Sequence, residues 1–141
     1  MVDMKQVLKR LNEALAIEYA DIIRYSTHAT VISGPYAETV GHRLEEIAED
    51  EEEHTDHIRE LIDYYGGDPQ MDVSTKDLKP ARSLEDILDI NIEAEKKAIT
   101  HYRTILKMVN VVQYTWLYET LEDIIEDEEE HLYELKTLRG K

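Results

Sequence analysis

The chain has 141 residues, the length of one ordinary domain. Its 32 Asp and Glu outnumber its 16 Lys and Arg, and the resulting net charge of −16 argues against nucleic acid or an anionic membrane as a partner, because both attract cationic surfaces. Cysteine is absent, which excludes disulfides, thiolate metal sites and cysteine nucleophiles. No apolar run approaches the ~18 residues of a membrane span, and the N-terminus lacks the apolar segment of a signal peptide, so we expect a soluble, cytoplasmic protein.

Apolar residues recur at steps of three and four between clusters of glycine and proline, a pattern that predicts helices. Four helices are expected, over residues 4–32, 36–65, 84–109 and 112–138. Asp3 and Gln6 are the expected capping pair of the first helix, and Ser83 is the expected N-cap of the third. No segment alternates with period two for long enough to form a strand, so the predicted fold class is all-α.

The connections between the helices predict how they are arranged. The turns near residues 34 and 110 are short, which favours two antiparallel hairpins. The segment 66–83 has 18 residues, more than the usual helix–helix connection needs. Fully extended, it spans up to about 59 Å, whereas a helix of ~27 residues is about 40 Å long. We therefore expect a four-helix bundle in which one long crossover joins the two hairpins.

The second half of the chain repeats the first at an offset of 77 residues. Residues 49–54 and 126–131 have the same sequence, EDEEEH, and the apolar positions on either side correspond as well. The repeat covers about residues 1–65 and 78–141. We expect a single domain over residues 1–141, with an approximate two-fold axis between the hairpins.

Acids and histidines interrupt the apolar stripes of the second and fourth helices. These stripes are Val40, Leu44, Ile47, Ile58 and Leu61 in one helix and Leu117, Leu121, Ile124, Leu135 and Leu138 in the other. Glu51 and His54 interrupt the first stripe at helical spacing, and Glu128 and His131 interrupt the second. All four side chains are therefore expected to point into the core.

Glu18 and Glu95 interrupt the stripes of the first and third helices in the same way. Glu18 and Glu51 are equally far from the turn near residue 34, and Glu95 and Glu128 are almost equally far from the break near residue 110. Each acid is about 16 residues, or roughly 24 Å, from its turn. The four glutamates and both histidines should therefore meet near the middle of the bundle.

Four buried carboxylates at one level repel each other, and each loses solvation worth several kcal/mol. The stripes contain no Lys or Arg to neutralise them, whereas two divalent cations would balance four carboxylates. A ligand set of four Glu and two His, rich in oxygen and free of sulfur, suits iron or manganese and argues against a structural zinc site. For either half alone, the commoner explanation of these residues is that the acids form a solvated face and the histidine is a hydrogen-bonded core residue. The match between the two halves favours the metal site.

Several other polar residues have more than one interpretation. Tyr25 and Tyr102 lie two turns from Glu18 and Glu95, where they could hydrogen-bond the carboxylates or simply fill the core. Most acids of the two acidic runs are expected to be solvated. The remaining histidines lie off the stripes and are predicted to be on the surface; they are His28, His42, His57 and His101.

The six stripe-interrupting residues resemble the ligand set of the ferritin-like di-iron carboxylate superfamily, most closely that of bacterioferritin, over about residues 3–138. The resemblance implies that Glu18 and His54 are terminal ligands of one iron. It assigns Glu95 and His131 to the second iron and makes Glu51 and Glu128 the bridging ligands. Tyr25 is similar to the tyrosine near the family's di-iron site that can donate an electron. Two iron ions per chain are implied, with manganese as the other suitable metal.

The resemblance implies a ferroxidase that oxidises Fe²⁺ with O₂ or H₂O₂ in bacterioferritin-like iron storage or detoxification. Bacterioferritin binds haem through a methionine directly after the second helix's glutamate, and here that residue is Glu52, so we do not expect haem. Ten residues follow His131, which leaves no room for the family's short fifth helix. We expect a homo-oligomer, either a dimer or a dodecameric shell.

Two alternatives remain at this point. The first is another di-metal redox enzyme on the same fold, a rubrerythrin-like peroxidase or a manganese catalase. Rubrerythrins carry an extra glutamate one turn after the third helix's ligand, where this chain has Ala98, and usually a cysteine-bound iron module. The second alternative is a non-enzymatic bundle whose acids bind cations at its surface.

Overall fold

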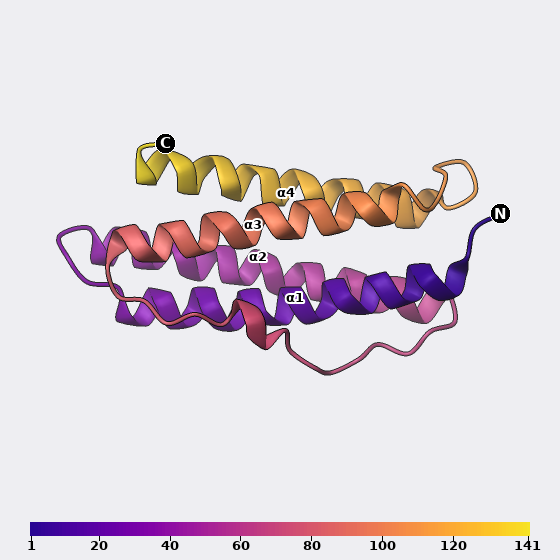
Figure 1. Ribbon diagram of the computed structural model, residues 1–141, viewed down its shortest axis with the longest axis horizontal. Helices are drawn as coiled ribbons and strands as arrows, with labels where there is room; N and C mark the ends of the chain where they lie inside the picture. The colour runs from indigo at the N-terminus through magenta and orange to yellow at the C-terminus, as the bar shows by residue number, and fades with distance from the viewer.

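The computed structural model describes residues 1–141 and contains four long α-helices and no strand (Figure 1). The elements are α1 (Met4–Val31), α2 (Ala37–Tyr64), the short 3₁₀ helix η1 (Thr75–Asp77), α3 (Leu84–Leu106) and α4 (Thr115–Arg139). Most of the contacts of α1 are with α2, and most of those of α3 are with α4. The predicted all-α bundle of two hairpins is thus confirmed. None of the helices has an apolar stretch that would let it cross a membrane.

Side-chain caps define where two of the helices begin. The Asp3 carboxylate accepts a hydrogen bond from the backbone N–H of Gln6, which satisfies one free donor in the first turn of α1. The Ser83 hydroxyl accepts the N–H of Asp86 at the start of α3 in the same way. Both caps lie where the sequence predicted them. Gly34, in the α1–α2 turn, has a φ of 101°, a conformation that glycine adopts without a steric penalty.

The connection between α3 and α4 is longer than predicted. The third helix ends at Leu106, three residues early, and the fourth begins at Thr115, three residues late. Asn110 causes this difference, because its side chain accepts the N–H of Gln113 and its carbonyl accepts the N–H of Tyr114. These bonds give the backbone an alternative to helical hydrogen bonding.

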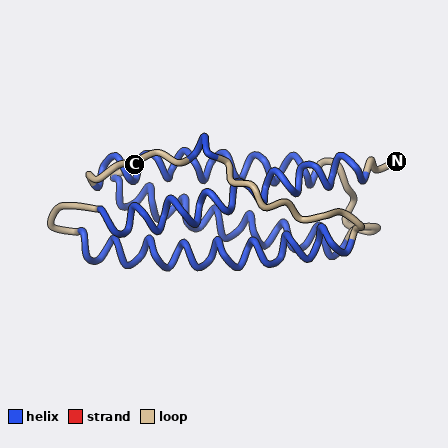
Figure 2. The backbone as a smooth tube through the Cα atoms, turned by 90° about the horizontal axis from the view of Figure 1, so that it is seen from below, coloured by secondary structure: helices blue, strands red, loops and turns tan.

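The crossover from α2 to α3 runs along the length of the bundle, as predicted (Figure 2), and Figure 1 shows that it lies beside α1. Hydrogen bonds fix it at several points. Gln70 donates its backbone N–H to Asn12 Oδ1 at 2.9 Å, and Ser74 donates its backbone N–H to the Ala16 carbonyl at 3.1 Å. The crossover is therefore held on one side of the bundle, against α1.

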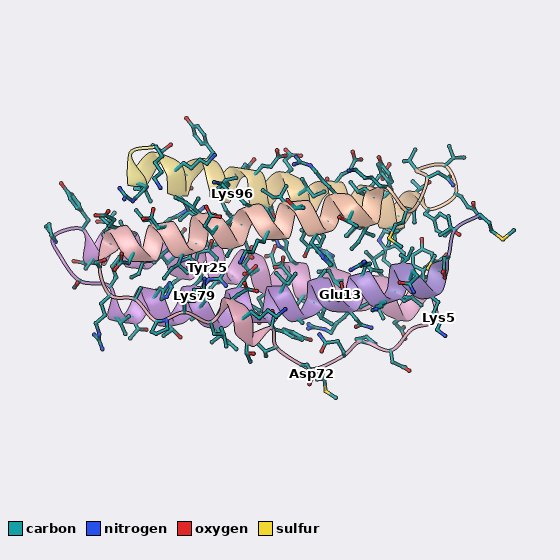
Figure 3. All side chains as sticks on the ribbon, in the orientation of Figure 1. Lys5, Glu13, Tyr25, Asp72, Lys79 and Lys96 are labelled. Atoms are coloured by element: carbon teal, nitrogen blue, oxygen red, sulfur yellow. The ribbon has the colours of Figure 1, made fainter.

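Two apolar clusters fill the bundle, and a polar layer separates them. The larger has 16 residues, including Leu11, Leu15, Ile58, Leu61, Ala98, Ile105 and Leu121. The smaller has 10 residues, including Leu44, Ile47, Leu88, Ile92 and Leu135. Along α2, Ile47 and Ile58 belong to different clusters, and the predicted ligands of that helix lie between them. Figure 3 shows Tyr25 inside the bundle, whereas Lys96 and Asp72 project from its surface.

The prediction that Leu138 is a core residue is wrong. Its side chain is 43% exposed, whereas its equivalent in the repeat, Leu61, is fully buried. Leu138 lies in the last turn of α4, just before the left-handed Gly140 that ends the helix. The packed part of α4 therefore ends at Leu135.

Candidate metal centre

The four helices bring together all six side chains predicted as metal ligands. They are Glu18 from α1, Glu51 and His54 from α2, Glu95 from α3, and Glu128 and His131 from α4. None of them is more than 3% exposed to solvent. The Glu and His of α2, and those of α4, share a helix face because residues three apart are neighbours on a helix.

The possible ligand atoms of these residues form two overlapping groups. Within each group, one atom from each residue lies within 4.8 Å of all the others. The groups are Glu18, Glu51, His54 and Glu128, and Glu51, Glu95, Glu128 and His131. Glu51 and Glu128 belong to both groups, so the arrangement provides two adjacent cation positions that share two carboxylates.

Both imidazoles turn their Nδ1 atoms towards the carboxylates. His54 Nδ1 lies 3.3 Å from Glu18 Oε2 and 3.3 Å from Glu128 Oε1. His131 Nδ1 lies 3.4 Å from Glu51 Oε1 and 3.5 Å from Glu128 Oε1. Nδ1 is therefore the nitrogen that each histidine can offer to a metal.

Six buried polar atoms of the centre have no hydrogen-bond partner. They are both carboxylate oxygens of Glu51, both of Glu128, Oε2 of Glu95 and Nδ1 of His131. An unpaired buried polar atom costs about 1–3 kcal/mol, and more when the group is charged. Since all six are oxygen or nitrogen atoms that can coordinate a cation, the residues present fit a pair of divalent metal ions.

Burial without metal makes the charged form of the glutamates unfavourable. It raises the pKa of Glu18 to about 7, and the nearby Glu128 contributes to that rise. Burial, together with the charge of Glu128, also raises the pKa values of Glu51 and Glu95 well above their ordinary range. The carboxylates therefore need positive charge within the centre to remain ionised.

Protons on the histidines provide that charge when no metal is bound. Burial alone would lower the pKa of His54, but Glu18 and Glu128 outweigh it and raise the pKa to about 12. Glu128 and Glu95 likewise outweigh burial at His131 and raise its pKa to about 11. Burial favours protonated Glu128, yet the two protonated histidines close to it, His131 and His54, hold its pKa well below the ordinary value. Metal binding through Nδ1 therefore has to displace two protons.

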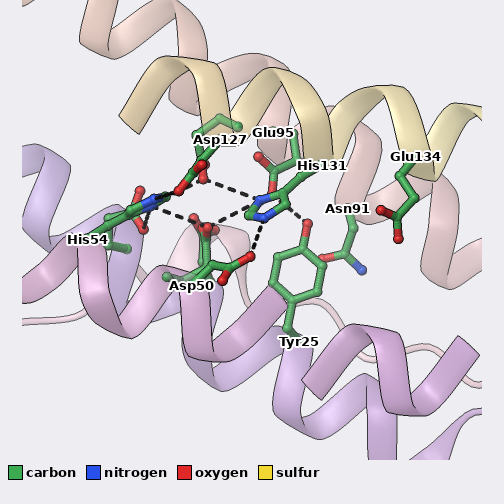
Figure 4. A network of polar contacts seen from close by, with 12 residues as sticks. Tyr25, Asp50, His54, Asn91, Glu95, Asp127, His131 and Glu134 are labelled. Atoms are coloured by element: carbon green, nitrogen blue, oxygen red, sulfur yellow. Dashed lines mark hydrogen bonds and ion pairs between the residues drawn. The ribbon is translucent and has the colours of Figure 1, made fainter. Parts of the chain in front are cut away.

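A tyrosine supports a glutamate on each side of the centre. The Tyr25 hydroxyl donates to Glu95 Oε1 at 2.6 Å, and the Tyr102 hydroxyl donates to Glu18 Oε1 at 2.7 Å. Burial raises the pKa of both tyrosines well above the ordinary value, so the hydroxyls remain protonated donors. Each tyrosine thus orients a carboxylate from the opposite half of the repeat, and Figure 4 shows the Tyr25 hydroxyl pointing towards Glu95 and His131.

Two aspartates that the sequence analysis did not single out hold the histidines from outside. Asp127 Oδ2 lies 2.9 Å from His54 Nε2, and Asp50 Oδ2 lies 2.9 Å from His131 Nε2 (Figure 4). A carboxylate that accepts the Nε2–H leaves Nδ1 free to face the centre. The signal for this role was present, because Asp50 and Asp127 occupy the same place in the identical EDEEEH runs.

A buried polar network lies beside one end of the centre only. The Arg24 guanidinium forms an ion pair with Asp21 at 2.6 Å, and its Nε donates to Asn91 Oδ1 at 2.8 Å. It also donates to the backbone carbonyl of Asp77 in the crossover at 3.1 Å. Arg24 and Asp21 are each 2% exposed. The prediction that the stripes carry no Lys or Arg holds, but Arg24 is buried beside them.

The prediction that His28 and His101 are surface residues is wrong. His28 is 1% exposed, because its Nε2 donates to the Lys79 carbonyl of the crossover at 2.7 Å and its Nδ1 accepts from Asn91 at 2.9 Å. His101 is only partly exposed and contacts the Arg10 carbonyl at 2.8 Å. The other two are exposed as predicted; they are His42 and His57.

Comparison with protein families matches residues 8–141 to the Ferritin family, described as a ferritin-like domain. Among solved structures, a ferritin-like di-iron carboxylate protein from Bacillus anthracis str. Ames shares 31% identity over 97% of both chains, with a TM-score of 0.91. A dodecameric thioferritin from Bacteroides fragilis, described as bacterioferritin-related, shares 27% identity over 97% of this chain and 86% of that one, with a TM-score of 0.90. A search of curated proteins finds no match.

Proposed function

This chain belongs to the ferritin family, and from that premise we propose that it is a di-iron ferroxidase that oxidises Fe²⁺ with O₂ or H₂O₂ in iron storage or detoxification. The observation that carries the proposal is the pair of overlapping ligand groups, in which six buried oxygen and nitrogen atoms have no hydrogen-bond partner. Two Fe²⁺ ions would contribute four positive charges against the four glutamates. Each bound Fe²⁺ would give up one electron, so the pair would supply the two electrons that reduce one molecule of O₂ or H₂O₂.

The six residues divide between the two metal positions. Glu18 and His54 would be terminal ligands of one ion, and Glu95 and His131 would hold the other in the same way. Membership of both groups makes Glu51 and Glu128 the natural bridging ligands; the two are fully buried.

The residues around the ligands hold and move protons. Asp127 and Asp50 would keep the Nε2–H of His54 and His131 pointing outwards, so that a binding metal can displace the proton from Nδ1 and release it to solvent. Tyr25 is proposed as an electron donor to the centre. Its hydroxyl already donates to Glu95 Oε1, so that oxygen can accept the phenolic proton when the ring is oxidised.

The assembly and the location of the protein are part of the same proposal. The B. fragilis relative is a dodecamer, which supports a homo-oligomer here, either a dodecameric shell or a dimer. Glu52, at the position of the haem-binding methionine, is an exposed carboxylate that suits water better than haem. We place the protein in the cytoplasm, without nucleic acid or membrane partners.

Anaerobic Fe²⁺ titration followed by addition of O₂ or H₂O₂ tests the proposal. Two Fe²⁺ per chain and a fast oxidation phase are expected. A stoichiometry far from two, or the absence of a fast phase, would contradict it. The ligand set also suits manganese, so rapid H₂O₂ turnover by manganese-loaded protein, together with slow Fe²⁺ oxidation, would favour the manganese catalase alternative.

A further inference from the structure

A surface pocket of about 220 Å³ lies between α1 and the crossover. Arg24, Thr27 and His28 contribute polar side chains to it from α1, and Lys79 contributes one from the crossover. No Asp or Glu lines the pocket, although the chain has 32 acidic residues. None of the lining residues belongs to the two ligand groups of the metal centre. The pocket is therefore a separate site, and its polar groups suit an anion.

Arg24 brings unused hydrogen-bond donors to this pocket. A guanidinium has five N–H donors and no acceptor. Three of these donors are taken up by Asn91 Oδ1 at 2.8 Å, the Asp77 carbonyl at 3.1 Å and Asp21 Oδ1 at 2.6 Å. The other two have no acceptor within the chain, and the residue is only 2% exposed. A ligand in the pocket that carries two acceptor oxygens can satisfy both donors.

Lys79 adds a positive charge that no acid balances. It is exposed and forms no ion pair within the chain. On its other side Lys79 borders a hollow that contains three acids. Each of these acids already has a cation of its own, in the pairs Asp77–Lys97 at 3.9 Å, Asp89–Arg139 at 2.9 Å and Glu93–Lys96 at 3.4 Å. Since Asp21 balances Arg24, the pocket is left with the single unbalanced charge of Lys79.

The remaining walls of the pocket are apolar and define the size of its ligand. They are formed by Ile23, Leu78 and Pro80, and Ile23 is 44% exposed. At about 30 Å³ for each water, the pocket holds about seven waters. This is less than the ~300–1,000 Å³ of a pocket for a drug-sized ligand, so the ligand has to be small. Inorganic phosphate would use the donors but leave the apolar walls uncovered.

We propose that this pocket binds a small organic carboxylate. Its two oxygens accept the free N–H groups of Arg24 and a hydrogen bond from the Lys79 ammonium, because a guanidinium fork matches the geometry of a carboxylate. Its single negative charge balances Lys79, and its hydrocarbon chain covers Ile23, Leu78 and Pro80. The Thr27 hydroxyl supplies a further donor. The inference goes beyond the proposed function and does not depend on it.

Titration of the metal-free, ¹⁵N-labelled protein with butyrate at constant ionic strength tests the proposal. The amide signals of Thr27, His28, Leu78 and Lys79 should shift and saturate together. Butyrate should bind about tenfold more tightly than acetate, because each of its two additional methylene groups contributes about fourfold when it is buried. Inorganic phosphate, which has no hydrocarbon part, should also bind more weakly than butyrate.

Lys79→Gln should weaken butyrate binding by about tenfold, since it removes a hydrogen bond to a charged group. The substitution keeps the backbone carbonyl that accepts from His28, so the crossover remains attached to α1. Lys76→Gln is the matched control, because it removes an exposed lysine of the same crossover that does not line the pocket. It should change the affinity by less than twofold.

Three results would overturn the carboxylate site. They are the absence of saturable shifts at the pocket amides, equal butyrate affinity of Lys79→Gln and Lys76→Gln, and binding of acetate or phosphate as tight as that of butyrate. Since the titrated protein contains no metal, each of these results would leave the metal centre and the proposed function unaffected.

Discussion

The metal centre has one end beside Tyr25 and another beside Tyr102, and different residues surround the ligands at the two ends. Beside Tyr25, Arg24 and its buried partners contact the crossover. At the positions equivalent to Asp21 and His28, 77 residues later, the second half has Ala98 and Ile105, which belong to the larger apolar cluster. One end of the centre is therefore enclosed by hydrocarbon and the other by a polar network.

The crossover explains this difference. It passes on the α1 side of the bundle, where the backbone carbonyls of Asp77 and Lys79 need hydrogen-bond donors. Arg24 and His28 provide those donors. Asp21 forms an ion pair with Arg24, and the Asn91 side chain hydrogen-bonds His28 Nδ1. The ligands thus follow the two-fold repeat because both metal positions need the same chemistry, whereas the surroundings follow the single crossover.

The largest effect is expected from Glu51→Ala, because Glu51 belongs to both ligand groups. Loss of a residue that only hydrogen-bonds a metal ligand costs about 10–100-fold in metal affinity or activity. Removing a ligand shared by both metal ions should therefore abolish the fast phase of Fe²⁺ oxidation. Stopped-flow oxidation kinetics measure this, with Glu52→Ala as the control, since Glu52 is its exposed neighbour. A fast phase that survives in Glu51→Ala would exclude the bridging role.

Arg24→Met should destabilise the protein more than the equivalent substitution His101→Met. Arg24→Met leaves Asp21 as an unpaired buried charge, which is expected to lower the free energy of unfolding by about 3–5 kcal/mol. Urea unfolding of the metal-free protein measures the change. Replacing Asp21 by Asn in the Arg24→Met background should recover part of the loss. Equal destabilisation by the two single substitutions would show that the network is not confined to one end.

Asp127→Asn and Asp50→Asn should weaken metal binding by similar factors, about 10–100-fold each, because each residue orients one histidine. Equilibrium titration with Co²⁺ measures the affinity, and Glu126→Gln, at an exposed position of α4, serves as the control. If either aspartate variant binds as tightly as the control, that aspartate does not position its histidine.

The smallest effect is a pH dependence due to His28. Burial lowers the pKa of His28 below its ordinary value, and the nearby Arg24 acts in the same direction. The unfolded chain therefore binds this proton more readily, so the contribution to stability is present above pH ~6.5 and is lost as the pH falls below it, by at most about 1.4 kcal/mol per pH unit. Urea unfolding at pH 7.5 and 5.5 should show a smaller difference for His28→Gln than for the wild type. His42→Gln, at an exposed position, should behave like the wild type; if His28→Gln does so too, His28 is not the group responsible.

The helices and the position of the six candidate ligands could be predicted from the sequence because they depend on local periodicity. Glu51 and His54 interrupt an apolar stripe, and the 77-residue repeat places Glu128 and His131 in the same way. Counting residues from the turns also places the acids at one level, since the helical rise is constant.

The surroundings of the centre could not be predicted, because they depend on packing between distant segments. His28 is buried by a crossover whose path is not determined by its length. Asp50 and Asp127 lie within acidic runs, where an aspartate that contacts a histidine has the same local sequence as a solvated one. Leu138 follows the apolar pattern, but α4 extends beyond the packed core at that point.

Anomalous diffraction from crystals soaked anaerobically with Fe²⁺ tests the central claim most directly. The account predicts two iron peaks per chain between Glu51 and Glu128, about 3.5–4 Å apart, one next to His54 and the other next to His131. A single peak, or iron bound only at exposed acids such as Asp123, would contradict it.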